Sequence, residues 1–263
     1  MKEKERDPAA GDPLFDLRGK VAVLTGAGGV LIAEMARELG RRGVKVVATN
    51  RSRPKAEVVA EDIRRGGGEA VALSMDVTER AGLEAAAADV MQRYGRVDFL
   101  INGAGGNVKE ATVGPDGSFF DLPEAALRRV VELNLMGALL PSQVFGRLMA
   151  GRREGVIINI SSMNAFRPLT RIAGYSAAKA AVNNFTQWLA VHLAQTCSPN
   201  IRVNALAPGF FETEQNRFLL RNEVGGSLTK RGERIVDHTP AGRFGVPADL
   251  LGTLVWLLSP SAA

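Results

Sequence analysis

The chain has 263 residues, of which 46% are hydrophobic and 23% are charged. This size and apolar content suit one domain with a well-filled core, and no apolar run reaches the roughly 18 residues that a membrane-spanning helix needs. The net charge of +5 is spread over scattered arginines, so it predicts a solvated basic surface that favours phosphate or carboxylate ligands rather than nucleic acid.

The start of the chain is charged, contains Pro8 and Pro13, and lacks the apolar segment of a secretory signal. We expect residues 1–16 to be a mobile tail and residues 17–263 to form the domain. The single cysteine, Cys197, excludes an internal disulfide and favours a cytoplasmic location. Because no group of Cys, His and acidic residues has metal-ligand spacing, we predict no metal.

Short apolar, β-branched runs alternate with helical patterns along the chain. The runs that we expect to be strands are 20–25, 44–49, 70–75, 97–102, 156–161 and 201–205. The stretches that we expect to be helices are 30–42, 54–65, 79–93, 123–149, 174–196 and 247–258. This alternation predicts an α/β fold: a single Rossmann-type domain with a doubly wound parallel sheet between two helical layers, a three-layer α/β/α arrangement. The long segments 103–122 and 208–242 follow strand ends, where ligands bind in such sheets.

The first predicted strand leads directly into a glycine-rich turn and then into a helix. The turn reads Thr25-Gly26-Ala27-Gly28-Gly29-Val30-Leu31. Glycines at such a turn let the backbone approach a pyrophosphate, which binds to the unpaired N–H groups of the helix N-terminus. We therefore predict a dinucleotide cofactor with contacts from Thr25, Gly26, Gly28, Gly29 and Leu31.

The segment after the second predicted strand bears on the choice of cofactor. It reads Asn50-Arg51-Ser52-Arg53 and lacks the Asp or Glu that binds the ribose 2′-hydroxyl of NAD(H). An amide, a serine and arginines suit a 2′-phosphate, so contacts from Asn50, Arg51 and Ser52 favour NADP(H) over NAD(H). The alternative is that the arginines only begin a helix.

Three further segments follow predicted strands and lie where a bound dinucleotide would run. Asp76 offers a carboxylate to the adenine amino group, and Thr213 offers a hydroxyl to the nicotinamide amide. Small residues after the fourth strand permit contact with adenosine. The cofactor contacts that we expect from these segments are Asp76, Val77, Asn102, Ala104, Gly105, Pro208, Gly209 and Thr213.

A tyrosine and a lysine four residues apart in the helix predicted at 174–196 indicate acid/base chemistry. Tyr175 and Lys179 share one helix face, and an ammonium group close to a phenol lowers its pKa from near 10 toward neutral pH. Ser162, 13 residues before Tyr175, can hydrogen-bond a carbonyl or alcohol oxygen while the tyrosine moves a proton. For the pair alone, the alternative is a surface tyrosine beside a solvated lysine.

Together these motifs resemble the short-chain dehydrogenase/reductase family, over the chain from Leu17 onward. The resemblance implies a catalytic quartet of Asn134, Ser162, Tyr175 and Lys179. It implies that Tyr175 is the general acid/base and that Ser162 positions the substrate oxygen. It implies that Lys179 lowers the tyrosine pKa and, with Tyr175, contacts the cofactor at the nicotinamide ribose.

By the same resemblance, Asn134 anchors a water that extends the proton relay; the alternative is an amide that bonds to its own helix backbone. The implied activity is the NAD(P)(H)-dependent interconversion of a secondary alcohol and a ketone. The implied assembly is a homotetramer or homodimer. The predicted helices at 123–149 and 174–196 carry more apolar residues than one buried face needs, which also favours an oligomer.

Longer strings resemble, more narrowly, the D-mannonate oxidoreductase (fructuronate reductase) branch of that family. They span residues 105–107, 161–172, 208–217 and 226–232. Their arginines and amides suit the carboxylate and hydroxyls of a sugar acid such as fructuronate. The substrate contacts that we expect are Asn107, Asn164, Arg167, Arg171, Gln215, Asn216 and Arg217.

Three alternatives remain open at this point. Arg167 and Arg171 can instead face solvent or a partner subunit. The substrate can be a neutral polyol, a ketose or another carbonyl compound. The chain can also be a catalytically weak dinucleotide-binding sensor or scaffold.

The chain departs from the family pattern at two places. Val30 and Ile32 stand where the family's glycine motif has glycines. The β-branched Ile32 is expected to weaken cofactor binding or to displace the helix that follows the turn. The chain also ends at Ala263, before the segment that carries the family's usual seventh strand.

Overall fold

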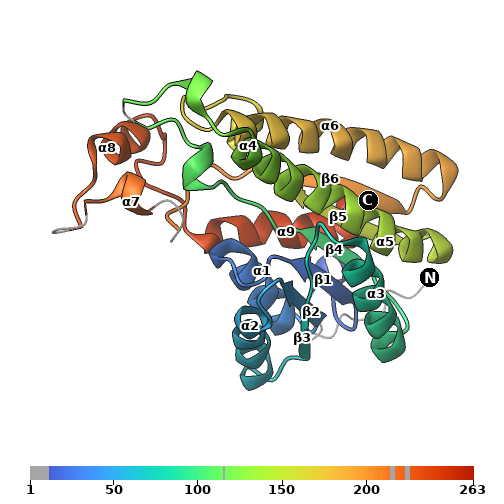
Figure 1. Cartoon of the computed structure of the whole chain (residues 1–263). Coiled ribbons are helices and arrows are strands. Elements are labelled where there is room, and N and C mark those ends of the chain that lie inside the picture. The colour runs from blue at the N-terminus through green and yellow to red at the C-terminus, as the bar shows by residue number, and fades with distance from the viewer. Residues whose placement is uncertain (1–11, 115, 214–216, 223–225) are drawn as a thin grey trace.

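A computed structural model describes residues 12–114, 116–213, 217–222 and 226–263. In this part of the chain, six strands form one parallel sheet in the order β3-β2-β1-β4-β5-β6 (Figure 1). The strands are β1 (Val21–Thr25), β2 (Lys45–Asn50), β3 (Ala70–Ser74), β4 (Phe99–Asn102), β5 (Gly155–Ile160) and β6 (Ile201–Leu206). The strand order reverses between β1 and β4, so the predicted doubly wound α/β sheet is confirmed.

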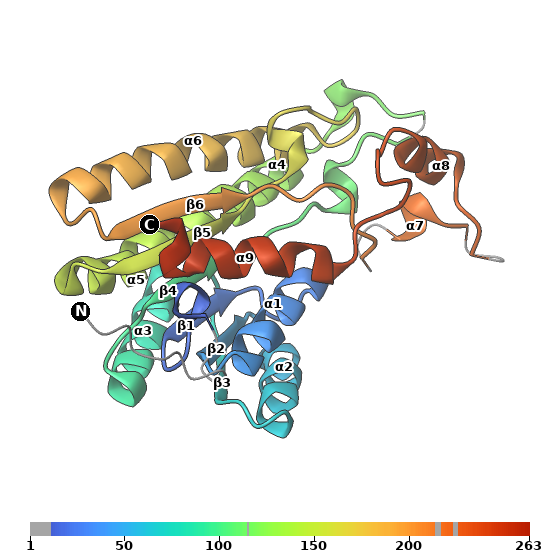
Figure 2. The same ribbon diagram turned by 180° about the vertical axis from the view of Figure 1, so that it is seen from behind.

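Helices cover both faces of the sheet, as the two opposite views show (Figures 1 and 2). The helices are α1 (Val30–Arg41), α2 (Arg53–Arg65), α3 (Arg80–Tyr94), α4 (Glu124–Val131), α5 (Gly137–Arg152), α6 (Ala173–Thr196), α7 (Arg217–Leu220), α8 (Lys230–Asp237) and α9 (Leu251–Leu258). One core contains residues of α1, α2 and α9, and the other contains residues of α3, α5 and α6. Successive strand residues alternate between them: Leu24 lies in the first core and Val23 in the second. Both faces are buried, which explains the continuous apolar runs in the sequence.

The chain between α4 and α5 differs from the single helix predicted at 123–149. A π-helical turn over Glu132–Met136 separates the two helices. Inside it, the Asn134 side chain donates hydrogen bonds to the carbonyls of Val130 (2.8 Å) and Gly106 (2.7 Å). Because Gly106 belongs to a distant loop, a tertiary contact stabilises the turn, and π turns of this kind often lie at functional sites.

The segment 208–242, expected as a loop, contains the two short helices α7 and α8. They pack closely: the backbone N–H of Thr229 donates to the Leu220 carbonyl (3.0 Å), and a Cβ on Gly232 would lie 2.4 Å from that carbonyl oxygen. The contact between α7 and α8 stabilises both, and the sequence pattern does not reveal it.

The described part of the chain begins at Asp12, inside the predicted tail. Residues 1–11, most of the predicted tail, lie outside the described residues. Asp12 caps a 3₁₀ turn over Pro13–Phe15, and Leu17 is buried in the core.

Ile32 does not displace the helix after the glycine turn, contrary to one of the two expected effects. Helix α1 begins at Val30, and Ile32 is 4% exposed within the core. Gly103, just after β4, leaves the space that the isoleucine fills, since a Cβ on Gly103 would lie 2.3 Å from Ile32 Cδ1. The missing glycine of α1 is therefore matched by a glycine on the neighbouring strand end.

We expect Ile32→Gly to lower the free energy of unfolding by about 3–5 kcal/mol, because it empties a packed site and places glycine inside a helix. Denaturant unfolding measures the change. Val30→Gly is the matched control: it lies at the other family glycine position, is 42% exposed, and should cost no more than about 1 kcal/mol. Unchanged or increased stability of Ile32→Gly would show that the isoleucine is strained rather than well packed.

Candidate active site

The glycine turn after β1 has the geometry of a phosphate-binding loop. Gly26 has a positive φ of 73°, and a Cβ there would lie 2.8 Å from Ala104 Cα. A Cβ on Gly28 would lie 2.7 Å from Lys55 Cβ and 2.9 Å from the Asn50 amide nitrogen. Helix α1 starts without a side-chain cap, which leaves its first N–H groups for a ligand. The turn therefore fits the pyrophosphate of a dinucleotide.

Two predicted cofactor contacts, Thr25 and Asn102, are buried beneath the site and stabilise the strand ends. The Thr25 hydroxyl accepts hydrogen bonds from the backbone N–H groups of Gly103 (3.0 Å) and Ala104 (3.1 Å). The Asn102 amide donates to Asn159 Oδ1 (2.8 Å) and thereby links β4 to β5. Both side chains are at most 3% exposed, so they position the backbone that faces the ligand.

The ends of β2 and β3 form the edge predicted to bind the adenosine. Asn50 Oδ1 accepts from the backbone N–H of Ser52 (2.9 Å). The side chains of Arg51 and Ser52 are exposed at this edge. The pKa of Asp76 is below its ordinary value: burial raises it, but hydrogen bonds from Thr78 and the charge of Arg51 outweigh this effect. Val77, also predicted here, is buried in the core.

Lys55 lies at the same edge and was not predicted from the sequence. Its position in the first turn of α2 brings its Cβ next to Gly28. The sequence contained a signal for this residue, because Lys55 lies only two residues after the Asn50–Arg53 segment.

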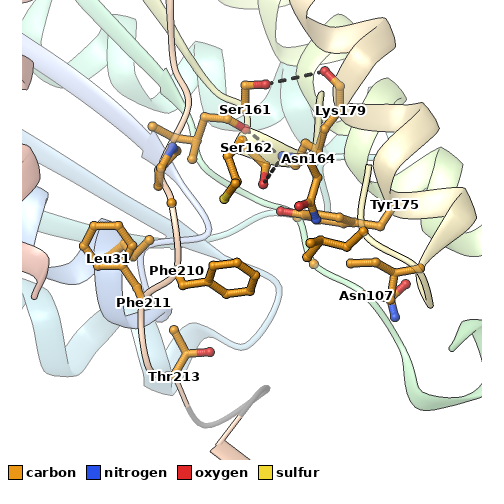
Figure 3. A pocket seen from close by; sticks show the side chains of 18 of the residues that line it. Leu31, Asn107, Ser161, Ser162, Asn164, Tyr175, Lys179, Phe210, Phe211 and Thr213 are labelled. Atoms are coloured by element: carbon orange, nitrogen blue, oxygen red, sulfur yellow. Dashed lines mark hydrogen bonds between the residues drawn. The ribbon is translucent and has the colours of Figure 1, made fainter. Parts of the chain in front are cut away.

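A cavity of about 420 Å³ opens at the carboxyl ends of β1, β4, β5 and β6 (Figure 3). The predicted cofactor contacts in its wall are Leu31, Gly105, Tyr175, Lys179, Pro208, Gly209 and Thr213. Phe210 and Phe211, which the sequence analysis did not single out, also line it. In the close-up view the Phe210 ring lies across the opening from Tyr175.

Ser162, Tyr175 and Lys179 meet in this cavity wall (Figure 3). Ser162 lies two residues after β5, and its hydroxyl accepts from the backbone N–H of Asn164 (3.2 Å). Lys179 Nζ donates to the carbonyl oxygen of Ile160, the last residue of β5 (2.7 Å), and lies 5.6 Å from the centre of the Tyr175 ring. The first turns of α6 are thereby joined to the end of β5.

Burial controls the protonation of both groups on α6. Burial raises the pKa of the Tyr175 phenol above its ordinary value, and a hydrogen bond with Ser162 only partly opposes this. Burial also lowers the pKa of Lys179 from 10.5 to about 8. From the sequence, Lys179 is expected to lower the pKa of Tyr175. In the structure that pKa is raised instead, because the cost of burying a phenolate dominates.

Asn134 lies one layer behind the cavity. Its side chain holds the loop after β4 at both backbone groups of one residue, because Oδ1 accepts from Gly106 N–H (3.0 Å) while Nδ2 donates to the Gly106 carbonyl. A Cβ on Gly105 would lie 2.7 Å from Asn134 Oδ1 and 3.2 Å from Lys179 Nζ. The amide also donates to the carbonyl of Val130, one turn earlier in the same helical segment. The alternative that Asn134 bonds to its own helix backbone therefore describes one of its contacts.

Three of the predicted substrate contacts lie in the cavity wall: Asn107, Asn164 and Arg171. The side-chain oxygens of Asn107 and Asn164 are buried and have no hydrogen-bond partner among the described residues. Buried amide oxygens of this kind are normally paired, which makes both side chains candidates for a hydrogen bond to a ligand hydroxyl. The backbone of Arg171 is held by a hydrogen bond, because its carbonyl accepts from the backbone N–H of Val113 (2.9 Å).

Two other predicted substrate contacts lie away from the cavity. Arg167 is exposed on the outer part of the loop before α6 and is not part of the cavity wall. Arg217 is exposed and lies 3.6 Å from the carboxylate of Glu212. Gln215 and Asn216 lie outside the described residues. Conversely, Arg231 on α8 lines the cavity, although the sequence analysis did not select it.

Two absences hold for the described part of the chain. It contains no group of three or more His, Cys, Asp or Glu residues that could hold a metal ion. None of its helices is long and apolar enough to cross a membrane.

We expect the stability of the cofactor-free protein to rise with pH because of Lys179. Its pKa is about 8 when folded and 10.5 when exposed, so between these values the unfolded chain binds more protons. The free energy of unfolding therefore gains on the order of 3 kcal/mol from this group across the window. Relative to Lys179→Met, the wild type should gain stability from about pH 8 to about pH 10 in denaturant titrations. Parallel curves for the two proteins would contradict the lowered pKa.

Comparisons with known proteins agree with this geometry. The family model for short-chain dehydrogenases matches residues 20–223. A Bacillus subtilis (strain 168) protein named "Uncharacterized oxidoreductase UxuB" is 48% identical over 258 residues, which are 95% of this chain and 91% of that relative. The 7alpha-hydroxysteroid dehydrogenase of Escherichia coli (strain K12) is 33% identical over 247 residues, 94% of this chain and 90% of that relative.

Among solved structures, one from Haemophilus influenza has a TM-score of 0.88 and 40% identity, over 94% of this chain and 91% of that one. That protein is provisionally identified as a D-mannonate oxidoreductase and holds NAD. The family match, the identity over nearly the whole chain and the shared fold lead to one conclusion. This chain belongs to the short-chain dehydrogenase/reductase family and is an oxidoreductase that acts on CH–OH groups with a nicotinamide dinucleotide.

Proposed function

We propose that this oxidoreductase interconverts the keto and hydroxy forms of a sugar acid. The observation that carries the proposal is the composition of the cavity wall beside Tyr175. Arg171 supplies a cation there, and Asn107 and Asn164 supply buried amide oxygens without partners. A guanidinium suits a carboxylate and amides suit hydroxyls, which is the chemistry of a polyhydroxylated acid. The structural relative provisionally identified as a D-mannonate oxidoreductase supports the same class.

In this proposal the side chains of Asn134, Ser162, Tyr175 and Lys179 have distinct roles. Tyr175 gives a proton to the substrate oxygen during reduction and takes it back during oxidation. Ser162 hydrogen-bonds that oxygen and holds it near the phenol. Lys179 holds the nicotinamide ribose, and Asn134 keeps the loop after β4 in place and extends the proton relay through a water. The nicotinamide cofactor supplies or accepts the hydride.

Two alternatives are less well supported. A neutral polyol or ketose would give Arg171 no charge to bind, although it would use the amide oxygens of Asn107 and Asn164. The steroid dehydrogenase among the relatives means that family membership alone does not select the substrate. A dinucleotide-binding sensor would need neither the buried Tyr175 nor its Ser162 partner.

We further propose that NADP(H) is preferred over NAD(H). Arg51 and Ser52 are exposed at the end of β2, where a 2′-phosphate would lie, and Lys55 adds a third polar group at this edge. The described residues at the end of β2 include no carboxylate to accept from a 2′-hydroxyl. Because Arg51 already contributes to the lowered pKa of Asp76, its charge acts at this edge of the site.

We also propose a cytoplasmic homodimer or homotetramer. On the face formed by α4 and α6, Val131, Trp188 and Val191 are 37%, 58% and 57% exposed. An exposed apolar surface of this kind is typical of a subunit contact. The single Cys197 is free, which suits a reducing compartment.

Tyr175→Phe should abolish turnover of a keto sugar acid while leaving cofactor affinity within about threefold, because it removes only the transferable proton. The loss should be at least about 100-fold in kcat, the lower end of the range for acid/base catalysis. Steady-state kinetics and cofactor titration by fluorescence measure the two quantities separately. If the variant kept more than a few per cent of activity, another group would be the acid/base.

Arg51→Ala should weaken NADPH relative to NADH by about 1–3 kcal/mol, the scale of one lost charge-assisted contact. Binding titrations with both cofactors measure the difference. The matched control is Arg53→Ala, an adjacent arginine that faces a hollow on the outer side of α2 together with Glu57 and Glu61. Equal losses for NADPH and NADH would mean that Arg51 does not contact the 2′-phosphate.

A further inference from the structure

The cavity wall contains a second arginine, from a part of the chain far from the acid/base residues. Arg231 lies in the first turn of α8, and Arg171 lies just before α6. Both line the cavity and both are partly buried. Figures 1 and 2 show α8 at the same end of the molecule as the start of α6. The cavity therefore has one guanidinium on each of two separate segments.

The two guanidinium groups are close enough to repel each other. The pKa of Arg231 is lowered first by burial and second by the charge of Arg171. Within residues 12–114, 116–213, 217–222 and 226–263, neither side chain forms an ion pair or a hydrogen bond. The side chains of the other partly buried arginines in the described part of the chain have hydrogen-bond or ion-pair partners, as Arg221 has in Glu212 (2.6 Å). An unpaired, partly buried pair of like charges is unfavourable for folding.

The position of Arg231 in its helix adds to this cost. It is the second residue of α8, and a cation in the first turn is disfavoured by the positive end of the helix dipole. The backbone at that place is nevertheless fixed. Thr229 caps the helix by accepting from Gly232 N–H (3.1 Å), and Gly232 packs against the Leu220 carbonyl. Among the described residues, no hydrogen bond or ion pair holds the Arg231 side chain, whereas an anion in the cavity would offset each unfavourable interaction.

We propose that Arg231 and Arg171 together bind the carboxylate of the substrate, and that Arg231 determines the preference for acids over neutral substrates. This proposal rests on the proposed sugar-acid function. One carboxylate has two oxygens and can accept from two guanidinium groups at once. Its charge would add two attractions that offset the repulsion between the arginines. A neutral ketose brings no such charge and gains nothing at this wall, so the discrimination depends on charge rather than shape.

The experiment compares Arg231→Gln with the matched control Arg234→Gln, which removes an exposed arginine of the same helix that is not part of the cavity wall. Steady-state kinetics use a panel of keto sugar acids and, for each, the neutral ketose of the same chain length. We expect Arg231→Gln to raise KM for the acids on the order of 10- to 100-fold, with kcat and the ketose parameters unchanged. Arg231→Lys should recover part of the loss, since it keeps the charge but not the fork. An equal rise for acids and ketoses, or no rise for either, would overturn the proposal.

A second measurement does not depend on turnover. Because D-gluconate carries a carboxylate and D-sorbitol does not, gluconate should raise the melting temperature of the wild type and of Arg234→Gln, while sorbitol at the same concentration should not. The gluconate shift should disappear in Arg231→Gln and in Arg171→Gln. If no sugar acid is turned over but this pattern holds, the proposed function fails and the arginine site stands. If keto acids are turned over equally well by Arg231→Gln, the function stands and the arginine site is wrong.

Discussion

The contact between Lys179 Nζ and the Ile160 carbonyl is the interaction on which the rest of the site depends. It joins helix α6 to the end of β5, so that Tyr175, one turn earlier on α6, lies beside Ser162, two residues after β5. The contact is also almost fully buried, since Lys179 is 4% exposed. A buried ammonium with one carbonyl partner is costly, and its pKa falls to about 8 as a result. The same burial keeps the Tyr175 phenol protonated, which suits the donation of a proton to a ketone.

The parallel direction of the strands explains why motifs far apart in the sequence could be assigned to one site. All six described strands are parallel, so the segments that follow them meet at a single edge. The glycine turn after β1, the small residues after β4, Ser162 after β5 and Pro208 after β6 are therefore neighbours in space, although they span most of the chain. The alternation of strands and helices was enough to predict this, because each apolar run is long and flanked by clear turn residues. Tyr175 and Ser162 could be paired because the helix and the strand end that carry them were both evident.

What the sequence did not reveal depends on contacts between segments. The π-helical turn at Asn134 exists because that side chain bonds to Gly106, and a helical pattern contains no trace of such a partner. The direction of the Tyr175 pKa was wrong because spacing shows that Lys179 is near but not how deeply both groups are buried. Ile32 was expected to disturb α1 because its partner Gly103 lies 71 positions along the chain. Arg231 was overlooked because α8 is short and packs on α7, a contact that the sequence pattern does not show.

The central claim is that burial rather than the lysine charge sets the protonation state of Tyr175, the proposed acid/base, and this can be measured directly. The chain has two tyrosines, Tyr94 and Tyr175, so in Tyr94→Phe the phenol signal of ¹³C-labelled tyrosine in NMR belongs to Tyr175 alone. Because Lys179 loses its proton near pH 8, it is already neutral when the phenol ionises. We predict that the pKa of Tyr175 in the cofactor-free protein lies above its ordinary value of 10.0 and is nearly unchanged when Lys179→Met is added. A pKa well below 10.0 that rises on adding Lys179→Met would contradict the claim and show that the lysine charge dominates.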